Sequence, residues 1–305
     1  MKKRAFKNMG RSDQIFYILN CIFWVVVMFI VLYPLYLVCI SSISDPNAIM
    51  RGEVIWKPVD ISFIAYKAIF KNKEIWLSYI NSLFYTFAGV FIAIAITLTA
   101  AYAMSRKHFP GKKLVSMYIL ITMFFSGGLI PSFLVIRNLG LYNTRWIMIL
   151  SGCASVWNLM VARTYIQSTI PEELYEAAVL DGASHIQYFS KVVIPLSKTI
   201  IAVLAVYYGV AKWNDYFTGL VYINDRNKLP LQTILKEILA TLQASRAEID
   251  FLTDEMAIKV LEEARKIAMV SKYGIIVVST VPVIILYVML QKYFEKGVMI
   301  GSLKG

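Results

Sequence analysis

Charged side chains are scarce in this sequence. They make up 16% of its 305 residues, whereas hydrophobic residues make up 58% and the mean hydropathy is +0.62. A soluble domain has about a quarter of its residues charged. The composition therefore excludes an ordinary soluble protein, and we expect a chain whose solvent is largely lipid.

Histidine and cysteine are scarcer still, with two and three residues. His108 and His185 have no companions at metal-ligand spacing, and the cysteines lie singly in apolar runs, at Cys21, Cys39 and Cys153. The Gly-x-x-x-x-Gly-Lys-Ser/Thr pattern that cradles ATP phosphates is also missing. We therefore expect no catalytic residue, no metal site and no cofactor bound by this chain.

Long apolar runs, in contrast, are abundant. A helix needs about 20 apolar residues to cross ~30 Å of hydrocarbon, and its backbone polar groups must be paired internally. Six stretches meet this requirement: about 15–40, 79–104, 114–136, 146–162, 199–223 and 274–294. The third contains Gly127, Gly128 and Pro131, where we expect a kink. The prediction is an all-α, polytopic membrane protein with six transmembrane helices and a single domain over residues 1–305.

Basic residues are concentrated in two short segments, residues 1–14 and the connection at 106–113. Because cytoplasmic loops retain Lys and Arg, both segments and both termini are predicted to be cytoplasmic. The same bias accounts for the net charge of +12 better than nucleic-acid binding does. The segment 224–272 then faces outward, and within it Asp254 to Val270 is predicted to be a helix capped by Thr253. That helix either packs on the outer mouth of the protein or docks an external partner.

The predicted cytoplasmic loop 167–198 has the pattern of a helix, a bend and a second helix. Pro171 suits a first helical turn. Gly182 permits a turn that a Cβ would obstruct. Ser184 can cap a short helix that ends before Pro195. The result would be a rigid knob outside the membrane, although periodicity alone does not exclude an ordinary linker.

Five residues of this loop give it a more specific meaning: Glu176, Ala177, Ala178, Gly182 and Pro195. Their spacing resembles the coupling loop of permease subunits of binding-protein-dependent ABC importers. Residues 124–131, 139–144, 181–184 and 213–216 are similar to the sugar-importer branch, in particular to the smaller six-span partner of the maltose-type pair. The Phe-Phe-Ser-Gly-Gly stretch within 124–131 is similar to a subgroup that often handles oligosaccharides.

The resemblance implies a set of partners. A second permease subunit completes a heterodimeric pathway in the bacterial cell membrane, and an extracytoplasmic solute-binding protein delivers the carbohydrate. A cytoplasmic ATPase dimer, which uses ATP and Mg²⁺, receives the coupling loop, to which Asp181 also belongs. Lys304 and Gly305 are expected either to contact the ATPase subunits or to form a frayed end. A modified sugar, a polyol or a glycan fragment is an alternative cargo. A stand-alone secondary transporter is a further alternative, but no inverted repeat is visible.

Span five has polar residues that invite a functional interpretation. Lys212 and Asp215 are three residues apart and are predicted to pair on one helix face. The residues around them could form a substrate pathway by stacking on sugar faces or bonding to hydroxyl groups: Tyr207, Tyr208, Trp213, Asn214 and Asp215. The alternative is an internal ion pair with its aromatics in the interfacial belt. Weaker candidates, either ligand contacts or bonds between helices, are Asn81, Tyr85, Trp157 and Asn158.

Overall fold

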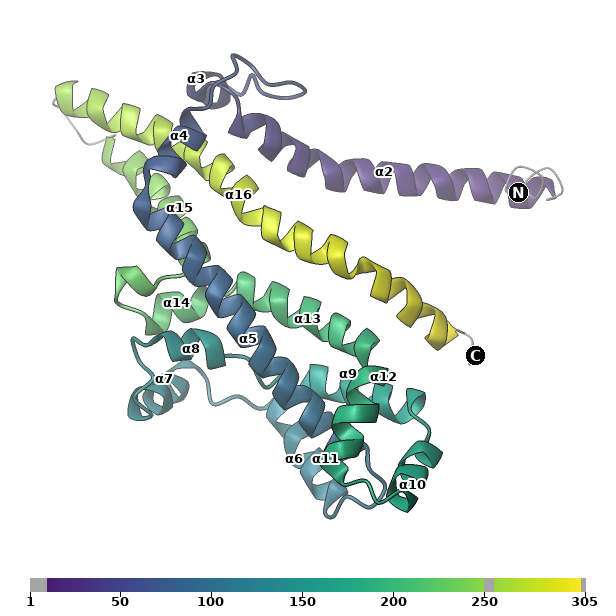
Figure 1. Cartoon of the computed structure of the whole chain (residues 1–305). Helices are drawn as coiled ribbons and strands as arrows, with labels where there is room; N and C mark the ends of the chain where they lie inside the picture. The colour runs from purple at the N-terminus through teal and green to yellow at the C-terminus, as the bar shows by residue number, and fades with distance from the viewer. Residues whose placement is uncertain (1–9, 250–254, 303–305) are drawn as a thin grey trace. The chain divides into compact units, whose positions relative to one another are not determined.

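The computed structural model describes residues 10–249 and 255–302, and within these ranges the regular structure is helical, without strands (Figure 1). The chain divides into two compact units. One comprises Met1–Lys71 with Ile238–Val278, and the other comprises Asn72–Glu237 with Ser279–Gly305. The helices α15 (Leu231–Ile249) and α16 (Glu255–Ser302) contribute residues to both units. The single domain over 1–305 and the cap at Thr253, which lies outside the described residues, stay predictions.

The first unit begins with α2 (Arg11–Ser42), followed by α3 (Pro46–Met50) and α4 (Ile64–Lys71). Asp45 caps α3 by accepting hydrogen bonds from the N–H groups of Asn47 and Ala48, as a short polar side chain at this position commonly does. The segment after α3 returns along α2. The hydroxyl of Tyr36 donates to the carbonyl of Trp56 over 2.7 Å and so fixes this return.

The second unit is built around one long helix, α5 (Lys73–Ser105). It packs against α8 (Arg145–Leu150), α9 (Val156–Thr169) and α13 (Lys198–Trp213). Buried alanines line these contacts at Ala93, Ala101 and Ala162. Small residues let the helix backbones approach closely, which is how helices associate where no water drives them together.

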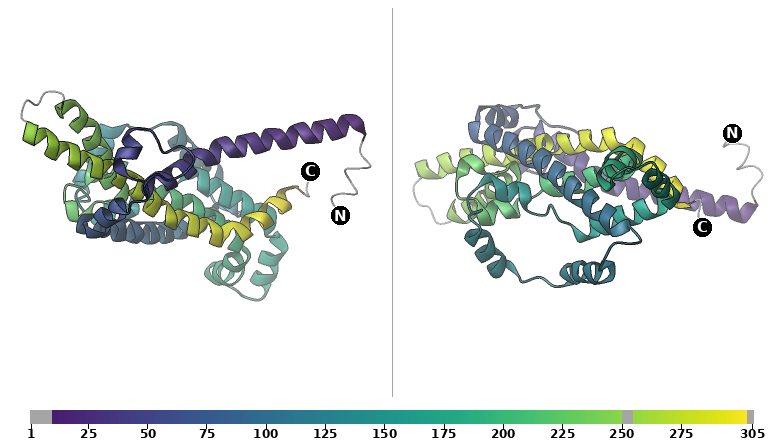
Figure 2. Two further views of the ribbon diagram at one scale, coloured as in Figure 1. Left: turned by 90° about the horizontal axis from the view of Figure 1, so that it is seen from above. Right: turned by 60° about the horizontal axis from the view of Figure 1, so that its bottom comes forward.

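The predicted kink in the third span is confirmed. Helices α6 (Lys112–Phe124) and α7 (Leu129–Asn138) are bent by 117° at the break between them. Gly128 adopts a φ of +83° there, and the right-hand view of Figure 2 shows the extended connection. Neither helix has a buried residue, and beyond the contacts of Ile119 with the core and of Phe133 with Tyr222 the pair leaves most of its apolar surface to lipid or to other protein.

Two other predicted spans are interrupted, contrary to the expectation of continuous helices. Residues 146–162 comprise α8, a non-helical stretch at 151–155 and the start of α9. Residues 199–223 comprise α13, a break at 214–216 and α14 (Phe217–Tyr222). Irregular backbone at membrane depth is tolerated where protein covers it. The first break meets this condition, because side chains of α13 bind it.

Three described helices are long and apolar enough to cross a membrane, namely Ser12–Ser42, Lys73–Ser105 and Ala268–Met289. Two bent pairs raise this number to five if each counts as one span: α6 with α7, and His185–Leu196 with α13, bent by 77°. The count of six spans and the cytoplasmic placement of both termini therefore stay predictions.

Candidate functional site

The loop between α9 and α13 folds as two helices around a sharp bend. Helix α10 (Glu172–Leu180) follows Pro171, and α11 (His185–Tyr188) follows Ser184. Gly182 between them has a φ of +74°, a left-handed conformation that costs other residues about 1–2 kcal/mol. No described atom lies within 4 Å of the position that a Cβ at Gly182 would take. The predicted turn at Gly182 is confirmed, and glycine is required there by the backbone conformation and not by contact with a neighbouring side chain.

Ser184 caps the second helix as predicted. Its Oγ accepts from the N–H of Gln187 at 3.3 Å, and the Gln187 side chain accepts from the N–H of Ser184 at 2.8 Å, which is a capping box. The predicted end before Pro195 is wrong. The chain continues through a π-helical turn, η1 (Phe189–Val193), into α12 (Ile194–Leu196). Because Pro195 has no N–H to give, the wider turn just before it accommodates the proline without ending the helix.

The loop has an outward face and an inward face. The predicted coupling residues Glu176, Ala177, Asp181, Gly182 and Pro195 are exposed. The most exposed of the loop's large apolar side chains are Leu180 at 88% and Ile186 at 79%. The inward face packs on the core of the second unit through Tyr175, Ala178, Tyr188 and Val192. Ala178 therefore turns away from the face that bears the other coupling residues.

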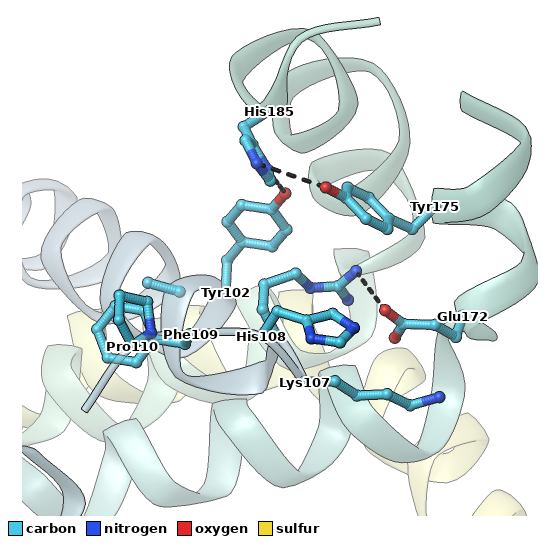
Figure 3. A pocket seen from close by; sticks show the side chains of 10 residues that line it. Tyr102, Lys107, His108, Phe109, Pro110, Glu172, Tyr175 and His185 are labelled. Atoms are coloured by element: carbon cyan, nitrogen blue, oxygen red, sulfur yellow. Dashed lines mark hydrogen bonds and ion pairs between the residues drawn. The ribbon is translucent and has the colours of Figure 1, made fainter. Parts of the chain in front are cut away.

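Behind the inward face lies a charged aromatic cluster that sequence reasoning missed (Figure 3). Arg106, at the end of α5, lies over the rings of Tyr102, Tyr175 and Tyr188 at 5.2, 5.0 and 5.7 Å from their centroids. Its Nη1 is 3.5 Å from Oε1 of Glu172. Burial raises the pKa of the Tyr188 phenol, and the charge of Arg106 opposes this shift. The one available signal was that Tyr102 and Arg106, four residues apart, share a helix face.

Lys212 in span five does not pair with Asp215, contrary to the prediction. Its Nζ donates to the carbonyl oxygens of Met148 and Ile149 at 2.9 and 2.8 Å, and also to that of Ser151. Asp215 instead accepts from the N–H of Thr218 at 3.0 Å. The ammonium of Lys212 thus satisfies carbonyl groups released where α8 ends, and Asp215 caps α14.

The predicted pathway residues fall into two groups. Tyr208 and Trp213 are buried. The Tyr208 hydroxyl bonds to Oγ1 of Thr97 at 2.7 Å and accepts from the N–H of Ser155 at 3.4 Å, and Nε1 of Trp213 donates to the carbonyl of Ser279 at 2.9 Å. These two rings therefore have no free face for a sugar in this conformation. Tyr207 and Asn214 are exposed and Asp215 is half-buried.

The weaker candidates in span two bind protein backbone. The side-chain amide of Asn81 donates to the carbonyls of Asn227 and Leu229, at 2.8 and 3.2 Å. The Tyr85 hydroxyl donates to the carbonyl of Lys228 at 2.9 Å. Both side chains thus hold the segment that follows α14 against α5. In span four, Asn158 is buried and Trp157 is exposed.

Comparison with known proteins gives this architecture a family. Residues 93–300 match the binding-protein-dependent transport system inner membrane component family. This chain belongs to that family. It is 35% identical to Protein LplC of Bacillus subtilis (strain 168) over 97% of each chain. It is 32% identical to the polygalacturonan/rhamnogalacturonan transport system permease protein YtcP of the same organism over 100% of each chain.

A solved structure extends the similarity to three dimensions. The crystal structure of a bacterial ABC transporter involved in the import of the acidic polysaccharide alginate contains a chain that is 34% identical to this permease. It superposes with a TM-score of 0.82 and covers 94% of this chain and 99% of that one. The predicted fold class, an all-α ABC importer permease in the membrane, is thereby confirmed. The permease is a multi-pass inner membrane protein.

The remaining predicted site of the permease is the C-terminal ATPase contact. Lys304 and Gly305 lie outside the described residues, so their role stays a prediction. The assignment of Glu176, Ala177, Ala178, Asp181, Gly182 and Pro195 to ATPase coupling is likewise a prediction. The structure places all six on one compact knob.

Proposed function

We propose that this permease is the non-catalytic half of a heterodimeric pathway for an oligosaccharide. A second permease subunit forms the other half, and an extracytoplasmic solute-binding protein delivers the cargo. A cytoplasmic ATPase dimer, to which ATP and Mg²⁺ bind, supplies the energy. ATP and the loaded binding protein would both favour the same state of the bundle, as ligands that select one of two conformations do.

The observation that carries this proposal is the outward face of the loop 167–198. Leu180 and Ile186 are more exposed than most apolar side chains among the described residues, yet the loop is predicted to lie in water. Exposed apolar patches on a rigid element mark sites where another protein binds. A cavity of about 320 Å³ at the Gly182 bend, lined in part by Asp181 and Lys191, offers a place for a partner side chain.

Leu180→Asp is expected to weaken the binding of the ATPase subunits by at least roughly thirtyfold, because a central apolar anchor of an interface contributes about 2 kcal/mol or more. Titration of the purified permease pair with the ATPase subunits measures this. Leu139→Asp is the matched control, since Leu139 is 67% exposed between α7 and α8. Equal affinity for both variants and the unaltered protein would contradict docking at α10.

The cargo is inferred from the relatives and from span five. The names of two relatives specify polysaccharides, and each is at least 32% identical to this chain over most of its length. Exposed Tyr207 and Asn214, with Asp215 beside them, are the residues of this chain that we assign to the pathway. An aromatic face and an amide suit a hydroxylated ring, because the first packs on its C–H face and the second bonds its hydroxyl groups.

The cargo is tested with the complete importer in proteoliposomes. We expect ATP hydrolysis to be stimulated by the binding protein loaded with oligosaccharides, neutral or acidic, and not by the same protein with a polyol or a monosaccharide. Stimulation by a polyol or a modified monosaccharide alone would move the assignment to that class. Uptake by the permease pair without ATPase subunits would instead indicate a secondary transporter.

A further inference from the structure

The backbone at Arg106 is held in place by side chains of neighbouring helices. It follows the last residue of α5, where two side chains from other helices bind the final carbonyls. Nε2 of Gln167 in α9 donates to the carbonyl of Ser105 at 3.3 Å, and Nζ of Lys112 in α6 donates to that of Arg106 at 3.0 Å. Because α5, α6 and α9 meet at this point, the backbone of Arg106 is tied to all three helices, and any partner that its guanidinium holds is linked to the end of α5.

The partners of that guanidinium come from the loop 167–198. Tyr175 and Glu172 belong to α10, and Tyr188 ends α11. Tyr188 is 1% exposed, and the Arg106 side chain is 11% exposed. A planar cation can stack on several aromatic faces and still pair with a carboxylate, which an ammonium group does less well. Arg106 thus holds both arms of the bent loop at once.

His185 adds further contacts between the loop 167–198 and α5. Its Nδ1 lies 3.3 Å from the Tyr102 hydroxyl of α5, and its Nε2 lies 3.4 Å from the Tyr175 hydroxyl of α10. The ring stacks on that of Tyr175 with centroids 5.5 Å apart. The Gly182 bend is what allows His185 and Tyr175, ten residues apart along the chain, to face each other (Figure 3).

We propose that Arg106 is the positioning residue through which the loop 167–198 moves α5. This rests on the proposed function, in which the outward face of the loop binds the ATPase. We call Arg106 together with Tyr102, Tyr175, Tyr188 and Glu172 the Arg106 cage. The motion of the ATPase acts on the outward face of the loop, and the Arg106 cage transmits that motion to span two. Without the cage the ATPase would still bind the loop and hydrolyse ATP. The loop would then move relative to α5, and α5 would not change position with it.

The test uses the complete importer in proteoliposomes and measures ATP hydrolysed per solute imported. Arg106→Ala is expected to raise this ratio by about fivefold or more, the lower end of typical coupling effects between sites, with unchanged affinity for the ATPase subunits. Arg163→Ala is the control. Arg163 is also a partly buried arginine, but its described hydrogen bonds go to Ser116 of α6 and Met160 of α9 and not to the cage. The ratio of ATP hydrolysed to solute imported should therefore stay at the unaltered value in Arg163→Ala.

Variants of the cage separate the ring contact from a general loss of structure. Tyr175→Phe keeps the aromatic face over Arg106 and loses only the 3.4 Å contact of its hydroxyl with His185, so it should remain near the unaltered ratio. Tyr175→Leu loses the face as well and should approach the ratio of Arg106→Ala. Arg106→Lys keeps the charge without the planar face and should lie between. If Arg106→Ala does not assemble, the comparison of the two Tyr175 variants decides the question.

An unchanged ratio in Arg106→Ala or in Tyr175→Leu, with a coupled unaltered importer, would overturn the role of the cage and leave the proposed function intact. Failure of the unaltered permease to bind an ATPase or to stimulate hydrolysis would overturn the proposed function instead. The two failures are therefore distinguishable in the same set of measurements.

Discussion

Gly182→Val is expected to raise the amount of ATP hydrolysed per solute imported by about tenfold or more. A change of this size lies within the range of coupling energies between linked sites. The φ of +74° at this position is a conformation that β-branched residues essentially do not adopt. The substituted chain must rotate the peptide at the bend, and α10 and α11 then no longer present one surface. Solute-stimulated ATP hydrolysis and solute uptake in proteoliposomes, measured side by side, give the ratio.

Two further variants show whether the bend or mere strain is responsible. Gly182→Asn should retain most of the coupling, because asparagine tolerates the left-handed region. Gly140→Val is the matched control for strain, since Gly140 has a φ of +69°, likewise has no described atom near its Cβ position, and lies outside the loop 167–198. If Gly140→Val and Gly182→Val uncouple the importer equally, the bend has no special part in coupling.

Lys212→Met is expected to lower the free energy of unfolding by about 3–5 kcal/mol, as the removal of one partner from a buried charged interaction does. Methionine has nearly the same length but leaves the carbonyls of Met148, Ile149 and Ser151 without their donor. Each unsatisfied buried group costs about 1–3 kcal/mol. Thermal unfolding of the purified permease in detergent measures the loss.

The control for this change is Lys198→Met, at the other end of α13, where the lysine is exposed. Its stability should remain within about 0.5 kcal/mol of the unaltered protein. Gly89→Ala is a second, independent test of the Lys212 site. A Cβ on Gly89 would lie 2.9 Å from Cε of Lys212 and 3.1 Å from the Ile149 carbonyl, so alanine should displace the lysine stem and destabilise the permease. Wild-type stability for both Lys212→Met and Gly89→Ala would show that the break in span four does not depend on Lys212.

The structure also explains why span four can be irregular at all. The stretch 151–155 belongs to no helix, although its two ends still bond to α8 and α9 through the N–H of Ser151 and the carbonyl of Ser155. Span five supplies partners at both ends of it, since Lys212 binds the carbonyls of Ile149 in α8 and of Ser151, and the Tyr208 hydroxyl accepts from the N–H of Ser155. Tyr208 is thus better understood as a partner of span four than as a sugar-stacking ring. The pathway assignment rests on Tyr207, Asn214 and Asp215.

Sequence patterns predicted the structure correctly where the interactions join residues that are close together in the chain. The helices α2 and α5 follow from apolar runs, because a backbone in lipid must pair its own polar groups and a helix does so within one segment. The bend of the loop 167–198 follows from Gly182 and the capping box at Ser184, which act within three residues of themselves. The kink at 125–128 follows likewise from its two glycines.

The sequence by itself determined an all-α membrane permease and the bend at Gly182 between two short helices. Only the tertiary structure decided which groups the charged side chains bind. Lys212 was predicted to pair with Asp215, three residues away, and instead binds carbonyls some 60 residues earlier in the chain. Arg106 meets rings from three helices. A long cationic side chain in a packed bundle takes the partners that best replace water, and these are set by how the helices pack and not by their spacing in sequence.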